Sequence, residues 1–306
     1  MILSIKKTLL LILGLALVIG AIASPHHKSK KPSKKSSKKL TKKNSPPPVP
    51  IPTGPKNTCR SFTDKFQNSR IVNQSAYNGD PTSADWIDTC GVPGTYTQSN
   101  GLNLNLLKPA DQQRTKGDDG YYNKVLGEGF SCNSTYKMLY GTVSMILKAN
   151  GVGGCVSALV CMSENGDEID WEMVGKDTKH AQSNYFYDRM LIYGVNGGVH
   201  EIPKNGQIDT DFHNYTIDWS PDYIKWYIDG SCVRTLERAD TYVNGTYRFP
   251  CHPSYVQMGI WDGSGAVGTA QWSNGPIDWT KQPSQLTSTI QQISITCNPD
   301  YNQVIN

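Results

Sequence analysis

The sequence contains few charged residues and no apolar stretch long enough to suggest several membrane spans. Charged residues make up 18% of the 306 positions, and the mean hydropathy is −0.47. A multi-span membrane protein is therefore excluded. No window of eleven residues shows a convincing helical period of apolar side chains. Disorder over the whole chain is excluded as well, because 16 Tyr, 7 Trp and 28 Gly are typical of many short strands and tight turns.

Acidic residues are missing from the first 44 positions, which hold eleven of the 30 basic residues. The remainder carries 19 basic and 26 acidic residues, a net charge of −7. A basic tail on an acidic domain does not indicate nucleic-acid binding. Residues 24–55 are rich in Lys and Ser and then in Pro, and they cannot bury a core. We expect a disordered tail here, either a solvated stalk or an electrostatic tether to anionic polysaccharide.

The chain begins with a pattern typical of secretion. Lys6 and Lys7 precede an apolar run of about fifteen residues, which is short for a membrane span. Ala21-Ile-Ala23 fits the rule for signal peptidase, so residues 1–23 are predicted to be a signal peptide. A signal anchor is the alternative, because the Lys cluster that follows resists translocation. With cleavage we expect a secreted, extracellular or cell-wall protein without stable membrane insertion, and the C-terminus shows no apolar tail for a lipid anchor.

Eight cysteines and four glycosylation sequons fit the same compartment. An even number of cysteines in a secreted chain predicts disulfides, although eight cysteines allow on the order of a hundred pairings. Cys155 and Cys161 belong to one predicted strand and lie too far apart to pair. The cysteines show no zinc-binding spacing, so neither a metal nor another cofactor is predicted. The sequons predict a glycoprotein, unless they are chance matches, and begin at Asn73, Asn133, Asn214 and Asn244.

From Cys59 onward, alternating segments follow one another. Polar and apolar residues alternate over residues 140–148, 215–219, 224–228 and 255–261. Asp229-Gly230 is a pair of the kind that closes a two-residue β-hairpin. Strands at this spacing predict an all-β fold, a jelly-roll sandwich of two antiparallel sheets. We expect one domain over residues 56–306, acting as a monomer.

The segment 166–175 is the most informative part of the sequence. Glu168, Asp170 and Glu172 alternate there with Ile169 and Trp171. In a strand, this period of two places three carboxylates on one face and two large apolar side chains on the other. Three neighbouring acids repel one another, so at least one pKa should be raised. Two carboxyl groups on either side of a glycosidic bond are what glycoside hydrolysis requires.

An exposed acidic strand and a calcium loop are the alternatives. Calcium ligands usually come from a loop with turns that Gly permits, whereas these acids alternate strictly and are backed by Trp171. A retaining reaction needs carboxyl groups about 5–5.5 Å apart. Residues four apart in a flat strand have Cα atoms about 13 Å apart, so the strand must curve to bring the side chains together over a concave face.

Glu168-Ile-Asp-Trp-Glu172 resembles the Glu-x-Asp-x-Glu signature of glycoside hydrolase family 16. Further segments follow in the family's order, over about 220 residues: Tyr140-Gly141, Asn184-Tyr-Phe186, residues 213–219, residues 224–230 and Gly259-Ile-Trp-Asp262. The resemblance implies a β-jelly-roll with a curved, concave glycan-binding cleft. It also implies a retaining mechanism in which Glu168 is the nucleophile and Glu172 the acid/base. Asp170 would orient Glu168 and tune its protonation.

Within the family, residues 167–172 and 259–263 most resemble the fungal Crh-type enzymes, which join chitin to β-glucan by transglycosylation. The resemblance therefore implies that the partners are the polysaccharides chitin and β-glucan. The sequence shows neither the N-terminal chitin-binding module nor the C-terminal anchor signal that are common in that group. Bacterial-type lichenases share much of the pattern, so the subfamily is less firmly indicated than the family.

Period two also predicts cleft residues outside the acidic strand. Gln257 and Trp261 share one face of segment 255–261, and the opposite face, Val256, Met258 and Ile260, belongs to the core. Trp261 is predicted to stack on a sugar ring, with an edge-of-core position as the alternative.

The resemblance supports the position of Trp261 and adds two residues to this set, Asn184 and Trp272. It implies that Asn184 hydrogen-bonds substrate hydroxyls and that Trp272 is a second candidate for stacking on a sugar. Trp219 and Trp226 are predicted to lie in the core, and His213 is interpreted as structural because no metal-ligand spacing surrounds it.

The sequence thus predicts a secreted enzyme that cleaves a β-linked glucan or chitin chain and transfers it to another glycan. A β-1,3(4)-glucanase, which transfers to water, is the first alternative, because the same three acids serve both reactions. A carbohydrate-binding jelly roll without turnover is the second. The presence of both Glu168 and Glu172 argues against it.

Overall fold

The computed structural model describes residues 46–51, 53–190 and 196–306. The predicted signal peptide and residues 24–45 of the predicted tail lie outside these residues. Within the described ranges, no helix is both long and apolar enough to cross a bilayer. The first described residues contact the domain, because the carbonyl groups of Pro47 and Val49 accept hydrogen bonds from Arg238 and from the Tyr301 hydroxyl. The domain boundary at residue 56 stays a prediction.

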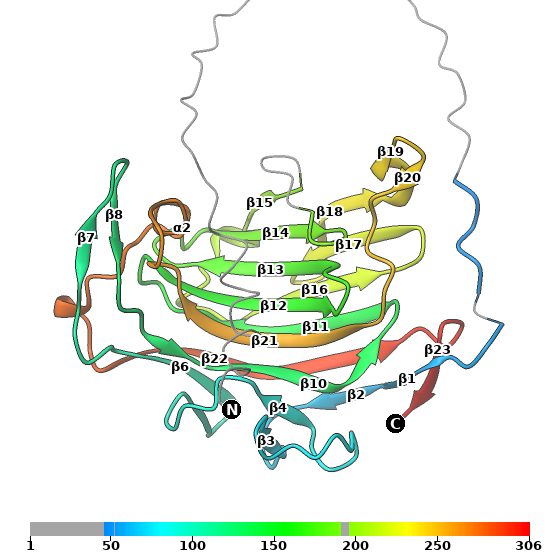
Figure 1. Ribbon diagram of the computed structural model, residues 1–306, viewed down its shortest axis with the longest axis horizontal. Coiled ribbons are helices and arrows are strands. Elements are labelled where there is room, and N and C mark those ends of the chain that lie inside the picture. Colours follow the sequence, from blue (N-terminus) through cyan, green and yellow to red (C-terminus); the bar gives the residue numbers. More distant parts are fainter. Residues whose placement is uncertain (1–45, 52, 191–195) are drawn as a thin grey trace, which may run out of the picture.

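One of two large sheets has eight strands in the order β15-β14-β13-β12-β21-β10-β4-β3, most of which can be followed down Figure 1. All neighbours are antiparallel except β3 and β4, which are parallel. Its strands are β3 (Ile71–Asn73), β4 (Trp86–Asp88), β10 (Ser131–Met138), β12 (Cys155–Ser163), β13 (Glu168–Val174), β14 (His180–Phe186), β15 (Gly198–Glu201) and β21 (Ser254–Asp262).

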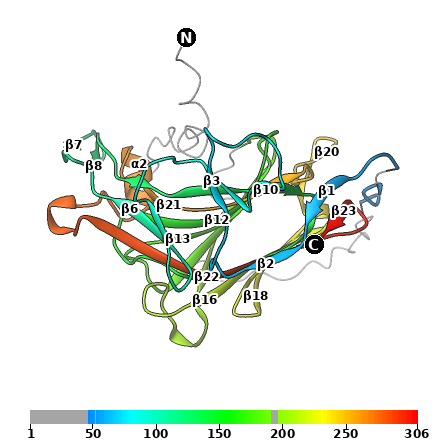
Figure 2. The ribbon, with the colours of Figure 1, turned by 90° about the horizontal axis from the view of Figure 1, so that it is seen from below.

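The second large sheet has nine strands in the order β18-β17-β16-β11-β22-β6-β5, with β2 beside β22 and β9 beside β6. Figure 2 shows the two sheets as curved, stacked layers. The strands of this sheet are β2 (Phe62–Asp64), β5 (Tyr96–Gln98), β6 (Leu102–Leu107), β9 (Glu128–Gly129), β11 (Gly141–Lys148), β16 (His213–Trp219), β17 (Tyr223–Ile228), β18 (Ser231–Glu237) and β22 (Gln285–Cys297).

Short elements complete the described fold. The two-stranded pairs are β1 (Asn57–Arg60) with β23 (Asn302–Ile305), β7 (Arg114–Lys116) with β8 (Tyr121–Asn123), and β19 (Tyr242–Val243) with β20 (Thr246–Tyr247). The helical segments are α2 (Val267–Trp272) and the 3-10 turns η2 (Pro203–Asn205), η3 (Arg238–Thr241) and η4 (Trp279–Lys281). The predicted all-β jelly-roll sandwich is confirmed.

Strand formation follows the alternation in the sequence. Every second residue of β16 and of β17 is buried, and the two strands pair from Tyr215–Ile228 to Trp219–Ile224. The next turn is Asp229-Gly230, with φ angles of 50° and 78°. Positive φ at both central residues matches the right-handed twist of a hairpin, and it is why an Asp-Gly pair stands here. His213 is buried and its Nδ1 lies 2.8 Å from Asp229 Oδ2, a structural contact as predicted.

The core lies between the two sheets and is rich in tryptophan. Trp171, Trp219 and Trp226 are fully buried, which confirms their predicted positions. Two of them also connect the sheets: Trp171 Nε1 donates to the Thr216 carbonyl (3.1 Å) and Trp226 Nε1 donates to the Asp170 carbonyl (3.0 Å). These bonds satisfy the indole N–H groups and hold strand β13 from behind.

Among the described residues, one disulfide forms, between Cys59 and Cys297. Cys155 and Cys161 remain unpaired with each other, as predicted, and both are buried. The other free cysteines are Cys90, Cys132, Cys232 and Cys251. The even count therefore correctly predicted a disulfide, although six of the eight cysteines are free.

Candidate active site

The three acidic residues lie on one face of β13, as the sequence predicted. Ile169 and Trp171 on the opposite face are 1% and 0% exposed. Strand β13 pairs in register with β12, which places Glu172 beside Ala158, Asp170 beside Val160 and Glu168 beside Met162. The three carboxylates, called the acid row below, therefore border an apolar strip. On the other side they face residues of β14.

The environment of the acid row favours the protonated form. Burial raises the pKa of Glu168 well above its usual value, and the charges of Asp170 and Glu172 add to that shift. Burial also raises the pKa of Asp170, to about 7, although hydrogen bonds from Glu168 and the Asn184 backbone and the charge of Arg234 oppose it. Burial, followed by the charge of Asp170, raises the pKa of Glu172 well above its usual value. The row can therefore hold protons near neutral pH.

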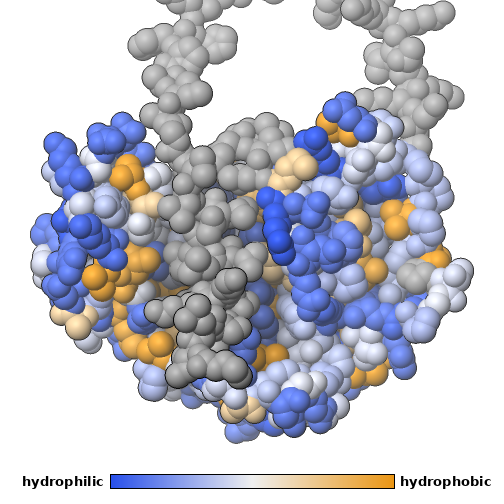
Figure 3. Space-filling model, in the orientation of Figure 1, coloured by the Kyte–Doolittle hydropathy of each residue, from blue (hydrophilic) through white to orange (hydrophobic). Residues whose placement is uncertain are grey.

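A cavity of about 220 Å³ opens beside the acid row and is lined by both glutamates. Its floor comes from β12 and β21, and its far wall from residues 126–131. The lining is mainly apolar and includes Trp261 and Gln257. Outside its grey atoms, the face of the molecule in Figure 3 is mostly hydrophilic, with apolar side chains gathered toward the side that carries α2. An apolar cleft with a few carboxyl and amide groups suits a sugar, whose ring faces are apolar and whose edges are polar.

Strand β21 supplies the cleft residues that its alternation predicted. Trp261 and Gln257 stand opposite Val156 and Val160 of β12 and line the cavity. Val256, Met258 and Ile260 are each 1% exposed and belong to the core, as predicted. Trp261 is therefore a cleft residue rather than an edge-of-core residue.

Trp272 reaches the cleft from a different element. It ends helix α2 and stacks on Trp261, with ring centroids 5.8 Å apart and an interplanar angle of 15°. Its Nε1 donates to Gln182 Oε1 (2.9 Å) on β14, directly across from Glu172. Gln182 was not predicted, although it lies two residues before Asn184 and period two would have placed it on the same face. The paired indoles form an aromatic wall next to the acid/base candidate.

Amide side chains flank the acids on both sides. Asn184 lies opposite Asp170, and its Oδ1 accepts the Tyr185 N–H (2.9 Å). Asn133 and Gln257 are neighbours on β10 and β21, and each has a buried amide oxygen without a hydrogen-bond partner in the described part of the chain. Buried polar atoms without partners are costly, so these two oxygens are suited to accept hydrogen bonds from a ligand.

Asp262, which the sequence did not single out as functional, supports the cavity wall. It follows Trp261 and its carboxylate accepts the Gly127 N–H (2.9 Å), the Ser264 N–H (3.0 Å) and the Trp279 Nε1–H (3.0 Å). Since Gly127 and Asp262 both line the cavity, these bonds fix the wall that faces the acids. The three donors are distant in sequence or lie in loops, which is why no spacing revealed them.

A half-buried cation lies behind the three acids. Arg234 of β18 donates to the Ser183 Oγ (2.8 Å) and carbonyl (3.1 Å) and to the Asn196 carbonyl (2.7 Å), and its guanidinium lies 4.5 Å from the centre of the Trp226 ring. Its charge favours ionised Asp170. The site thus combines raised pKa values on the cleft side with a positive charge between the sheets.

With this geometry established, comparison with known proteins identifies the family. The family model of glycosyl hydrolases family 16 matches residues 85–284, a stretch that includes the acid row, β21 and Trp272. The chain belongs to glycosyl hydrolases family 16. The predicted family is confirmed.

The similar relatives within family 16 are Crh-like proteins, as predicted. The chain is 30% identical to Crh-like protein 2 of Aspergillus fumigatus, in an alignment that covers 82% of this chain and 52% of the relative. It is 31% identical to Congo red hypersensitive protein 2 of Saccharomyces cerevisiae, over 82% of this chain and 50% of the relative. The chain thus spans about half the length of these relatives.

Solved family 16 structures share the fold. A structure described as Crh5 transglycosylase in complex with NAG superposes with a TM-score of 0.61 and 26% identity, covering 80% of this chain and 88% of that one. The β-glucanase of Bacillus licheniformis superposes with a TM-score of 0.57 at 20% identity, covering 81% and 100%. The second likeness is one of fold alone.

Proposed function

We propose that this protein is an extracellular transglycosylase of fungal-wall type that cleaves a β-linked glucan or chitin chain and transfers it, with retention, to another glycan. The observation that carries the proposal is the row of three carboxylates on β13, two of which line one cavity. Glu168 would attack the anomeric carbon, and Glu172 would protonate the leaving oxygen. Polysaccharides are then the partners, and the protein would act as a monomer.

Both protonation states that this mechanism needs are available in the row. Glu172 must carry a proton in the first step, and burial together with the charge of Asp170 raises its pKa. Glu168 must be ionised to attack. A hydrogen bond between the two side chains raises the pKa of Glu168 and lowers that of Asp170, and the pKa of Asp170 is still about 7, so Asp170 can hold a proton while Glu168 reacts. In the second step Glu172 takes the proton of the incoming hydroxyl group.

Transfer to a glycan is favoured over transfer to water by the aromatic wall. Once the glycosyl-enzyme has formed at Glu168, water and a sugar hydroxyl compete for it. A sugar that stacks on Trp261 and Trp272 has its hydroxyl held near Glu172, which converts a bimolecular step into an effectively unimolecular one. The likeness to the Crh5 transglycosylase supports the same choice.

The four sequons and the predicted signal peptide support the proposed extracellular location of the protein. Asn244 is exposed between β19 and β20 and is the most accessible acceptor. Asn73 and Asn214 lie in strands β3 and β16 and are partly exposed. Asn133 differs, because it lies beside Gln257 and a glycan attached there would occupy the cleft.

The test mixes purified protein with laminari-oligosaccharides and labelled chito-oligosaccharides and analyses the products by mass spectrometry. Labelled products heavier than either starting sugar are expected, and Glu168→Gln is the matched control that should give none. Shorter products alone would replace the transglycosylase with a glucanase. Binding without any product in the wild type would leave a carbohydrate-binding jelly roll.

A further inference from the structure

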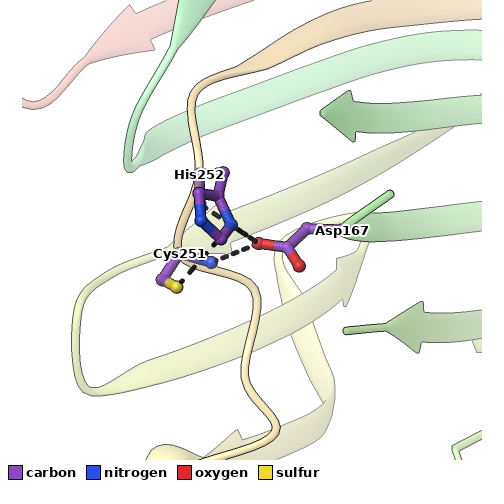
Figure 4. A group of neighbouring side chains, drawn as sticks. All are labelled: Asp167, Cys251 and His252. Atoms are coloured by element: carbon purple, nitrogen blue, oxygen red, sulfur yellow. Dashed lines mark hydrogen bonds and ion pairs between the residues drawn. The ribbon is translucent and has the colours of Figure 1, made fainter. Parts of the chain in front are cut away.

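Three side chains that the proposed reaction does not use converge at the start of β13. Asp167 comes directly before that strand, and Cys251 and His252 lie in the segment just before β21, which begins at Ser254 (Figure 4). His252 Nδ1 lies 2.7 Å from Asp167 Oδ2 and 3.9 Å from Cys251 Sγ. The three atoms all lie within 4.8 Å of one another. They are a carboxylate oxygen, an imidazole nitrogen and a thiol sulfur.

The carboxylate of this cluster is held rigidly. Asp167 is 0% exposed, and its Oδ2 also accepts the backbone N–H groups of Cys251 (2.8 Å) and His252 (3.1 Å). Its Oδ1 accepts the Asp188 N–H (3.0 Å). In the described ranges its one ion-pair partner is His252, and neither Lys nor Arg forms a pair with it. A buried carboxylate without a permanent cation is costly, and a metal ion at Oδ2 would remove that cost.

We propose that Asp167 Oδ2, Cys251 Sγ and His252 Nδ1 bind one Zn²⁺ ion. This set of one oxygen, one nitrogen and one sulfur ligand suits zinc, with water as the fourth ligand. Cys251 is exposed and provides the entry path. When zinc binds, the thiol proton leaves to solvent and the proton on His252 Nδ1 is replaced by one on Nε2, so that the imidazole stays neutral. The ion with one thiolate, one carboxylate and a neutral imidazole then carries no net charge.

Small movements of the ligand atoms would be needed for tetrahedral coordination of zinc. Tetrahedral zinc with ordinary ligand lengths holds its ligand atoms roughly 3.3–3.7 Å apart. His252 Nδ1 and Asp167 Oδ2 must therefore separate by about half an ångström. The 3.9 Å between Cys251 Sγ and His252 Nδ1 is close to the required spacing, and Sγ lies within 4.8 Å of Asp167 Oδ2. The two backbone N–H groups on Oδ2 keep the carboxylate oriented, as outer-shell donors do in metal sites.

Bound zinc would stabilise the folded protein. Zinc would connect the start of β13 to the segment before β21, two strands that are separated by β12 in the sheet. Asp167 directly precedes Glu168 in the chain, so the ion would also hold the end of the acid row. No spacing motif predicted this site, because Asp167 and Cys251 are 84 residues apart.

Cobalt is the probe for the ligand set. The purified full chain, reduced and free of metal, is titrated with Co²⁺. A thiolate-to-cobalt charge-transfer band in the near ultraviolet is expected at one ion per chain. Cys251→Ser should abolish the band, whereas Cys232→Ser, which removes another exposed cysteine, should leave it unchanged. Absence of the band in the wild type, or its persistence in Cys251→Ser, would overturn the proposal.

Zinc binding is measured in parallel by equilibrium dialysis and thermal unfolding. One zinc ion per chain should bind in the micromolar range or tighter, and Cys251→Ser should weaken it at least about tenfold. Zinc should raise the midpoint of unfolding of the wild type and of Cys232→Ser, but not that of Cys251→Ser. His26 and His27 could bind zinc independently, so both measurements are repeated with these residues changed to Ala. Loss of binding in that variant alone would overturn the assignment.

Discussion

Two buried carboxylates in one sheet, Asp170 and Asp262, have opposite surroundings. Asp262 is 3% exposed and accepts three N–H bonds, which oppose the rise in its pKa caused by burial. Asp170 is 2% exposed, but its Oδ1 has no partner in the described chain, and its pKa rises to about 7. The exposed fractions of the two side chains are nearly equal. More N–H donors hold the Asp262 carboxylate in place, whereas the hydrogen bonds and the Arg234 charge at Asp170 only partly oppose the rise in its pKa.

The largest effect is expected from Glu168→Gln, which tests the reactive side of this comparison. The substitution keeps the shape of the side chain and removes the attacking charge. We expect turnover to fall by at least about a thousandfold, while glycan binding measured by calorimetry stays close to the wild-type level. If the variant retains a tenth of the wild-type rate, Glu168 is not the nucleophile, and Asp170 has no reactive neighbour whose proton it could hold.

Glu172→Gln should have the next largest effect, and one that depends on the substrate. Glycosides with poor leaving groups need the proton that Glu172 supplies, and we expect them to slow by roughly 10²–10⁴-fold. Activated aryl glycosides need little protonation and should slow much less in the first step. Rates for both substrates are measured with the same preparation. Equal slowing of the two would remove Glu172 from the acid/base role.

Asp262→Asn tests the structural role of Asp262 in this comparison. Both the Gly127 N–H and the Trp279 Nε1–H point at one carboxylate oxygen, and an amide cannot accept all three bonds. One buried N–H group loses its acceptor, which should cost about 1–3 kcal/mol in the free energy of unfolding measured with urea. Asp300→Asn, at an exposed position, is the control and should change little. Unchanged stability in Asp262→Asn would mean that the three bonds do not distinguish the two acids.

The pH dependence of stability should reveal the raised pKa of Asp170. Between about pH 4 and pH 7 the folded protein binds more protons at this carboxyl than the unfolded chain does. The free energy of unfolding should therefore fall as pH rises through this window. Asp170→Asn should make the decline shallower, whereas Asp300→Asn should leave it unchanged. A decline equally steep in Asp170→Asn would show that other groups cause it.

The smallest effect is expected from Trp272→Ala, on the aromatic wall next to the acids. Loss of one stacking ring is worth about 1 kcal/mol, so the ratio of transfer to hydrolysis should drop a few-fold. Donor consumption should change less than the ratio, measured at a fixed acceptor concentration. If the ratio is unchanged while transfer persists, Trp272 does not hold the acceptor, and Trp261 becomes the residue to test.

The sequence predicted those parts of the site that depend on period two within one strand. Glu168 and Glu172 on β13 and Trp261 on β21 lie where alternation placed them, because each strand has one face in the core. Contacts between distant segments could not be predicted in this way. The Trp272–Gln182 bond joins residues 90 apart, and the Trp279–Asp262 bond depends on how a loop returns to β21. Such contacts are fixed by packing and leave no periodic signal.

The Cys59–Cys297 bond has a mechanical consequence for a protein proposed to work in a wall under tension. It joins positions 238 residues apart, close to where β1 and β23 pair in parallel. A pull applied to the chain before Cys59 and after Cys297 passes through this covalent link. The strands that carry the acid row lie inside the closed loop and bear none of that load. Stretching the surrounding polymer network would therefore leave the shape of the cleft unchanged.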